Sequence, residues 1–148
     1  MEAGSPHLEE TLRDIRKLPP DSLDARFMTT IPEERIPTTY IQQLNAADRT
    51  TVQRACLLAW AVTGGTQVPR EPQLRVLLAI YHGIDCLFYA GTGSGKTLPI
   101  ALLLLLDDPE NGYVSLTISP LKRLQVTQVS GSPSFITKLQ IVLSLCSL

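Results

Sequence analysis

Apolar side chains between residues 41 and 62 recur at helical spacing. The repeating positions are Val52, Cys56, Ala59 and Trp60. Intervals of three and four residues place such side chains on one face of a helix, so we expect this face to be buried. Asn45 or Asp48 can cap the start of the helix, and Gly64-Gly65 is typical of its end. The pattern therefore predicts a helical segment within residues 40–66.

The preceding residues, 1–39, are polar and interrupted by prolines at positions 6, 19, 20, 32 and 37. A short helix is expected at His7–Lys17. Proline lacks a backbone N–H and blocks both helix and sheet hydrogen bonds. The rest of this region is therefore predicted to be an irregular arm.

The middle of the chain alternates between helical and strand patterns. Gln67–Pro72 is a proline-punctuated connector, and Gln73–His82 is predicted to be a helix that Gly83 ends. Ile84–Ala90 is short, apolar and aromatic and is bounded by glycines, which favours a strand. Lys96–Leu106 is leucine-rich nearly all round, as in a helix packed between a sheet and other helices.

A second strand is predicted at Tyr113–Ser119, where β-forming residues alternate, and another helix at Leu121–Val129. The predicted order is thus helix, strand, glycine loop, helix, strand, helix. This alternation is typical of an α/β fold with a parallel sheet.

Composition narrows the class of protein. A chain of 148 residues with 44% hydrophobic residues allows one domain with a buried core. The net charge of −1 leaves no global attraction for nucleic acid, although Tyr113–Leu148 contains no Asp or Glu. Cys56, Cys86 and Cys146 are far apart, so we expect reduced core thiols in an intracellular protein and no disulfide framework or zinc site.

The chain shows no sign of a membrane protein. Its start lacks the basic and apolar stretches of a signal peptide. The longest apolar run, Ile100–Leu106, is far shorter than the roughly 20 residues of a membrane-spanning helix. We therefore expect no membrane partner.

The most informative stretch is AGTGSGKT at residues 90–97. A phosphate-binding loop needs inward-pointing backbone N–H groups, a helix N-terminus behind them, a lysine for the outer phosphates and a hydroxyl for Mg²⁺. Glycines 91, 93 and 95 satisfy the first need, and Lys96 and Thr97 satisfy the last two. The alternative is a flexible turn with a chance GKT, which the flanking strand and helix disfavour. Ala90 departs from the strict pattern, which has glycine at that position.

The alanine variant AxTGxGKT resembles motif I of the superfamily 2 helicases. The matching residues are Ala90, Thr92, Gly93, Gly95, Lys96 and Thr97. The resemblance implies that Thr92, Gly93, Ser94, Gly95, Lys96 and Thr97 bind ATP and that the Thr97 hydroxyl binds Mg²⁺.

Upstream residues are similar to the opening of RecQ-like helicases, in which Arg-x-x-Gln, a helix and Gly-x-Asp precede motif I. Here these are Arg70, Gln73, Gly83 and Asp85. The resemblance implies that Gln73 reads the edge of adenine with Arg70 as its partner. The alternative is that Gln73 merely opens a helix. Pro69 replaces the usual aromatic residue, so the stacking part of base recognition departs from the family.

Downstream, the segment LTISPLKRLQVTQV resembles motif Ia, which touches the backbone of one DNA strand. The residues implied in that contact are Ser119, Pro120, Leu121, Lys122 and Arg123. A hydroxyl, helix N–H groups and two cations suit phosphate. The alternative is a strand-to-helix turn with a solvated basic face.

Taken together, the resemblance covers residues 67–129 and implies part of a RecA-like P-loop lobe preceded by a helical and irregular N-terminal arm. It implies ATP and Mg²⁺ as cofactors, single-stranded or unwinding DNA as a weakly held partner, 3′–5′ polarity and, in a eukaryote, a nuclear location. A small P-loop ATP-binding module without helicase activity is the alternative. A small-molecule kinase fits Ala90 and the SPLKRL segment less well.

The chain lacks acidic residues where the chemistry of a motor needs them. No DExH or DEAD tetrad follows Ser119, and no second lobe is present. Phosphoryl transfer needs a strand-end carboxylate for Mg²⁺ and an oriented water. Asp107 and Asp108 are the nearby acids, but a solvated helix end suits them better. We therefore assign no catalytic residue and expect no helicase motor from this chain alone.

The tail, residues 130–148, departs from the helicase pattern and suggests a truncated product. The alternative is a short protein whose tail closes the fold as an amphipathic helix. That helix would present Phe135, Ile136, Leu139 and Leu143.

Overall fold

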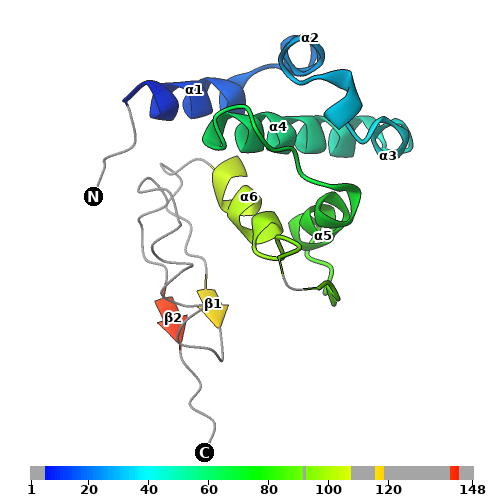
Figure 1. Cartoon of the computed structure of the whole chain (residues 1–148), viewed down its shortest axis with the longest axis vertical. Coiled ribbons are helices and arrows are strands. Elements are labelled where there is room, and N and C mark those ends of the chain that lie inside the picture. Colours follow the sequence, from blue (N-terminus) through cyan, green and yellow to red (C-terminus); the bar gives the residue numbers. More distant parts are fainter. Residues whose placement is uncertain (1–5, 92, 108–115, 119–140, 144–148) are drawn as a thin grey trace, which may run out of the picture.

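The computed structural model describes residues 6–91, 93–107, 116–118 and 141–143, and helices dominate this part of the chain (Figure 1). The helices are α1 (Pro6–Lys17), α2 (Pro20–Thr30), the 3₁₀ helix η1 (Glu33–Arg35), α3 (Thr38–Gln42), α4 (Ala46–Val62), α5 (Glu71–Tyr81) and α6 (Leu98–Leu106), and the strands are β1 (Leu116–Ile118) and β2 (Ile141–Leu143).

Helix α4 begins and ends where the sequence predicts. The Asn45 side-chain oxygen accepts the Asp48 N–H at 2.9 Å, which satisfies one of the unpaired donors of the first turn. Beyond Thr63 the chain turns through Gly64 and Gly65, whose φ angles are +62° and +78°. Glycine adopts this left-handed conformation without steric strain, so the glycine pair ends the helix.

Helix α4 lies at the centre of the fold. Helices α1 and α2 pack on one side of it, and α5 and α6 pack on the other (Figure 1). The predicted apolar face is buried at Val52, Cys56 and Ala59, whereas Trp60 is only partly buried. Ala55, at the same spacing, is buried as well, and so are Gln53, Leu57 and Leu58 on other faces. The helix is therefore covered on more than the one face that its spacing suggests.

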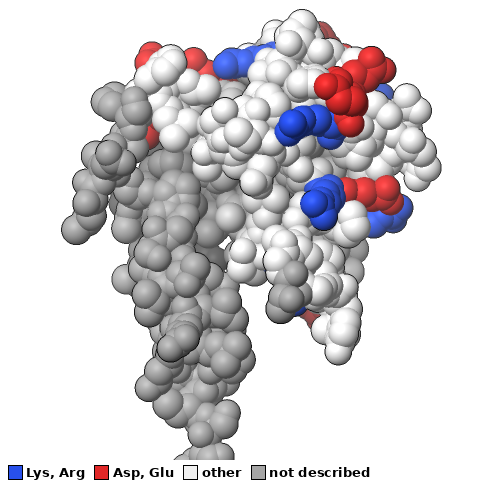
Figure 2. All heavy atoms as spheres, viewed as in Figure 1, with Lys and Arg blue, Asp and Glu red and all other residues white. Residues whose placement is uncertain are grey.

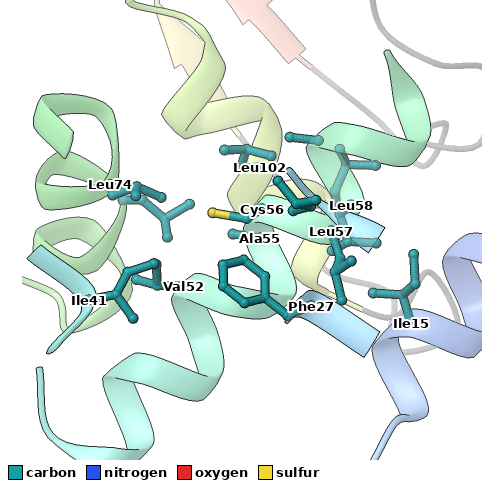
Figure 3. Close-up of a cluster of buried hydrophobic side chains, with 14 of the residues drawn as sticks. Ile15, Phe27, Ile41, Val52, Ala55, Cys56, Leu57, Leu58, Leu74 and Leu102 are labelled. Carbon is teal, nitrogen blue, oxygen red and sulfur yellow. The ribbon is translucent and has the colours of Figure 1, made fainter. Parts of the chain in front are cut away.

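The core forms where the helices meet around α4. Figure 3 shows side chains from α1, α2, α3, α4, α5 and α6 converging around Cys56. The most deeply buried large side chains include Phe27, Leu58, Leu74 and Leu102. Cys56 is a core thiol, as predicted, but Cys86 is exposed, and Cys146 lies outside the described residues.

Most of the predicted irregular arm is helical. Pro20 stands in the first turn of α2, where a helical N–H has no partner in any case, so it starts the helix instead of breaking it. Leu23 and Phe27 of α2 are buried against α4, and Gln53 of α4 donates to the Asp24 carboxylate at 2.6 Å. The prediction of an irregular arm is therefore wrong for α2, whereas the short helix predicted at His7–Lys17 is confirmed by α1.

The strand predicted at Ile84–Ala90 does not form. Among the described residues nothing pairs with this segment, and Leu87 and Tyr89 are 91% and 96% exposed. A strand needs a partner for its backbone groups, and a short apolar and aromatic run between glycines does not supply one. The strand predicted at Tyr113–Ser119 is confirmed at β1.

Strands β1 and β2 pair in parallel, with Leu116 opposite Ile141 and Ile118 opposite Leu143. The predicted parallel sheet comprised 84–90 and 113–119, which this pair does not test, so a RecA-like parallel sheet remains a prediction. Because 141–143 form a strand, the alternative of an amphipathic helix is wrong for these residues. The helix predicted at Leu121–Val129 lies outside the described residues.

Candidate nucleotide-binding site

The glycine loop folds back on itself between Ala90 and the start of α6. The Ser94 N–H donates to the Gly91 carbonyl at 3.3 Å. Gly93 and Gly95 have φ angles of +79° and +71°, which a side chain would strain. A Cβ at Gly95 would also lie 2.7 Å from the Gln73 side-chain nitrogen, whereas one at Gly93 would meet nothing within 4 Å. Gly95 is therefore required by both its conformation and its neighbour.

Helix α6 begins at Leu98, two residues later than predicted. The Leu98 N–H donates to the Gly95 carbonyl at 3.0 Å, and Pro99 stands in the first turn. No described residue accepts the backbone N–H groups of Gly95, Lys96 or Thr97. These donors, at the positive end of the helix dipole, form an arrangement that suits an anion.

The side chains of Lys96 and Thr97 are exposed at this helix start. An ammonium group and a hydroxyl beside open backbone donors fit the outer phosphates of a nucleotide and its Mg²⁺ ion. The residues of the loop therefore fit a bound Mg²⁺–nucleotide. The Ser94 hydroxyl is a buried polar group in the same loop that lacks a hydrogen-bond partner among the described residues.

Gln73 connects α5 to the loop. Its side-chain nitrogen donates to the carbonyls of Ser94 at 2.9 Å and Gly95 at 3.3 Å. Its side-chain oxygen accepts the Arg70 N–H at 2.8 Å, and the residue is 6% exposed. The sequence allowed two interpretations of Gln73, as a residue that opens a helix and as a residue that reads adenine. In the structure Gln73 opens α5, and contact with adenine stays a prediction. The structure also places its side chain against the loop, which the sequence did not predict.

The residues before α5 differ in exposure. Arg70 is exposed at the position that precedes the helix, within reach of solvent. Pro69 is fully buried and so packs in the core, where it offers no surface for stacking on a base.

Several predicted site residues lie outside the described part of the chain. These are Thr92 and the residues implied in DNA contact, Ser119, Pro120, Leu121, Lys122 and Arg123. Their roles stay predictions. The same holds for Asp108, whereas Asp107 follows the end of α6 and is exposed.

Charge on the described surface is mixed. Figure 2 shows Lys and Arg side chains lying beside Asp and Glu side chains. One such pair is Arg75 with Glu71 at 2.8 Å, and the Arg75 guanidinium also lies over the Tyr40 ring at 4.9 Å from its centroid. Within the described ranges no group of three or more His, Cys, Asp and Glu could hold a metal ion. None of the described helices is long and apolar enough to cross a membrane.

Comparison with known protein families identifies one that matches this chain. The model of the DEAD/DEAH box helicase family matches residues 70–147, a range that begins at Arg70 and contains the glycine loop. It runs past residue 129, where the sequence alone predicted the helicase pattern to end. No solved structure matches the chain.

The curated relatives are much longer proteins. "Probable ATP-dependent RNA helicase DDX52" of Mus musculus is 41% identical over 71 residues, which are 46% of this chain and 12% of the relative. Its counterpart in Bos taurus is 39% identical over 71 residues. "ATP-dependent DNA helicase Q4" of Homo sapiens is 39% identical over 69 residues, which are 47% of this chain and 6% of the relative. The chain thus spans about an eighth or less of the length of these relatives.

Proposed function

Because the chain belongs to the DEAD/DEAH box helicase family, we propose that it binds ATP with Mg²⁺ through residues 90–97 and forms part of a nucleic-acid helicase. The observation that carries this proposal is the loop itself. The backbone N–H groups of Gly95, Lys96 and Thr97, which have no acceptor among the described residues, directly precede α6. The Gln73 side chain donates a hydrogen bond to the Ser94 carbonyl of the loop. Phosphate binding at a helix N-terminus rests on this combination of donors and dipole.

Each residue of the loop has a role in the proposed complex. The backbone N–H groups of Gly95, Lys96 and Thr97 donate to the phosphates, and Lys96 neutralises the outer ones. The Thr97 hydroxyl is a hard oxygen ligand of the kind that Mg²⁺ prefers. The ion, when bound, supplies positive charge that spreads the negative charge of the phosphates.

Gln73 has two proposed roles that compete for the same atoms. Both hydrogens of its side-chain nitrogen are directed to loop carbonyls, and its oxygen already accepts one N–H. The oxygen has a second lone pair and can still accept a hydrogen bond from adenine, whereas donation to adenine would require one of the two N–H bonds to the loop to be exchanged. We therefore propose that Gln73 braces the loop and donates to the edge of adenine, a contact that the RecQ-like resemblance implies, only when it releases a carbonyl of Ser94 or Gly95.

For the nucleic acid, we propose DNA. The order Arg70, Gln73, Gly83, Asp85 and motif I supports the RecQ-like branch, and one relative is named a DNA helicase. Other relatives are named RNA helicases, which makes RNA the alternative substrate. The proposed contact residues, Ser119–Arg123, would bind the sugar–phosphate backbone.

A second candidate function is a small P-loop module that binds ATP without unwinding nucleic acid. The stretch from Tyr113 to Leu148 contains no Asp or Glu, so it does not itself supply the carboxylate beyond the loop that ATP hydrolysis by helicases requires. Both candidates share the ATP site and differ in nucleic-acid binding and unwinding.

The ATP site is tested with the full chain, Lys96→Ala and the control Lys17→Ala, which removes an exposed lysine of α1. We expect Mg²⁺–ATP to bind the wild type and the control alike. Loss of the Lys96 charge should weaken binding by about 10- to 100-fold, as for the loss of a hydrogen bond to a charged group. Equal affinity of Lys96→Ala and wild type for Mg²⁺–ATP would contradict ATP binding by residues 90–97.

The nucleic-acid assignment is tested by titrating single-stranded DNA and RNA of the same sequence at several salt concentrations. We expect DNA to bind more tightly, with a salt slope that falls by about one or more when Lys122 and Arg123 are both changed to Ala. Tighter binding of RNA contradicts the RecQ-like branch, and the absence of any binding favours the ATP-binding module.

A further inference from the structure

The far end of α6 contacts the N-terminal part of the chain. The Arg16 guanidinium, on α1, donates through Nε to the Leu105 carbonyl at 2.6 Å, across 89 residues of sequence. Leu105 is 3% exposed, and Arg16 is partly buried. The contact is therefore a charge-assisted hydrogen bond that water only partly reaches.

This end of the helix needs such a partner. The last four carbonyls of a helix have no partner within the helix, and they form the negative end of its dipole. The Asp107 N–H satisfies the Leu103 carbonyl at 3.3 Å, and Arg16 satisfies the Leu105 carbonyl. A cation at this position both fills a hydrogen bond and complements the dipole.

Arg16 is itself held in place. Helix α1 packs against α4 through Leu12 and Ile15, which are buried. From α4, Arg54 donates to the carbonyls of Ile15 at 3.3 Å and Leu18 at 2.9 Å, around the end of α1. The guanidinium that reaches α6 therefore extends from a helix whose own end is fixed to the central helix.

Helix α6 is consequently held at both ends. At its start Gln73 bonds the carbonyls of Ser94 and Gly95, and at its end Arg16 bonds Leu105. A helix of 9 residues is roughly 14 Å long and stiff, so a shift at one end tilts the other. The position of the open N–H groups therefore depends on both contacts.

We infer that Arg16 is a positioning residue for the nucleotide loop, and that α1 belongs functionally to the ATP-binding unit although the family match begins at residue 70. The inference rests on the proposed ATP site. It adds that a residue 74 positions before the start of the loop at Ala90 sets the affinity of that loop through the orientation of α6.

The carboxyl group of Asp107 gives a second way to detect the position of the Arg16 guanidinium. Burial raises the pKa of Asp107, and the nearby Arg16 charge partly offsets this rise. Removing the Arg16 charge should therefore raise the pKa of Asp107 further. A carboxyl titration followed by NMR thus shows whether Arg16 occupies the end of α6 in solution.

The test compares the full wild-type chain with Arg16→Ala, Arg16→Lys and the control Arg13→Ala, which removes an exposed arginine one turn earlier in α1. The readout is the Kd of a fluorescent Mg²⁺–ATP analogue. We expect Arg16→Ala to weaken binding about fivefold, as when a residue outside a site alters its coupling. Arg16→Lys keeps a positive charge and N–H donors, so its Kd should lie closer to that of the wild type. The Kd of Arg13→Ala should equal that of the wild type.

A measurement on the wild type alone guards against variants that fail to fold. Hydrogen exchange with and without Mg²⁺–ATP should show slower exchange at the loop, through α6 and at the end of α1 together. Protection confined to residues 90–98, or an Arg16→Ala chain that is folded and binds as wild type, overturns the inference. Absence of ATP binding by the wild type, or its persistence in Lys96→Ala, instead overturns the proposed function.

Discussion

The contact between Gln73 and the loop determines what each glycine can tolerate. Gly95 has both a left-handed backbone and a side-chain nitrogen 2.7 Å from where a Cβ would stand, while Gly93 has the same backbone and open space. The two glycines therefore separate backbone strain from displacement of Gln73. Gly83, with a φ angle of +70° and nothing within 4 Å of where a Cβ would stand, gives the same backbone strain outside residues 90–97.

We predict that Gly83→Ala, Gly93→Ala and Gly95→Ala each lower the free energy of unfolding by about 1–2 kcal/mol, because each places a side chain in the left-handed region. Only Gly95→Ala should also displace Gln73, and it should weaken Mg²⁺–ATP binding the most. Urea unfolding and nucleotide titration measure the two effects. An ATP affinity of Gly95→Ala equal to that of Gly83→Ala would show that the Gln73 contact does not support the loop.

The two cysteines in the described part of the chain differ in exposure. Burial raises the pKa of Cys56 to about 12, whereas Cys86 is exposed. The thiolate is the reactive form, so at about pH 8 the Cys56 thiolate is only about one part in ten thousand of the total. We predict that iodoacetamide labels Cys86 and leaves Cys56 unmodified until the protein is unfolded in urea, as read by peptide mass. Labelling of Cys56 at the same rate as Cys86 under native conditions contradicts its place in the core.

At the scale of elements, the helices with strong local signals were predictable and the others were not. Helix α4 has a capping Asn45 and a terminal glycine pair, and α5 has a regular apolar repeat. Helix α2 was missed because Pro20 blocks a helix only beyond its first turn, and the sequence does not say where the turn begins. The strand at 84–90 was predicted from a short apolar and aromatic run between glycines, but a strand depends on a partner that local sequence does not supply.

Helix α2 gives the corresponding stability prediction. Phe27 is 1% exposed and packs in the core, whereas its neighbour Met28 is 58% exposed. Phe27→Ala should lower the free energy of unfolding by about 3–5 kcal/mol through lost burial and the cavity left behind. Met28→Ala should change it by less than about 0.5 kcal/mol. Equal effects of the two substitutions in urea unfolding would mean that α2 does not belong to the folded core.

At the scale of the whole molecule, the site joins segments that the sequence cannot relate. The glycine loop and its lysine were identifiable from AGTGSGKT, because the residue types and their order carry the chemistry. The Arg16–Leu105 bond and the Gln73 bonds to the loop were not, because each depends on how helices pack over long sequence separations. The predicted nucleic-acid contacts at 119–123 lie outside the described residues and stay predictions.

A further prediction for the whole molecule concerns ATP hydrolysis. We predict that nucleic acid does not stimulate ATP hydrolysis by the 148-residue chain, since no carboxylate follows Tyr113 to hold Mg²⁺ or orient water. Phosphate release measured with and without single-stranded DNA and RNA should show the same low rate. Clear stimulation that Asp107→Asn abolishes would instead identify Asp107 as the missing acid.

The central claim is that the open N–H groups at the start of α6 receive the phosphates of ATP. It is tested most directly by following the backbone amide NMR signals of Gly95, Lys96 and Thr97 during a titration with Mg²⁺–ATP. We predict that the three signals shift together with a single Kd and that Lys96→Ala abolishes the shifts. Signals that stay in place while other amides shift would put the nucleotide elsewhere and contradict the account.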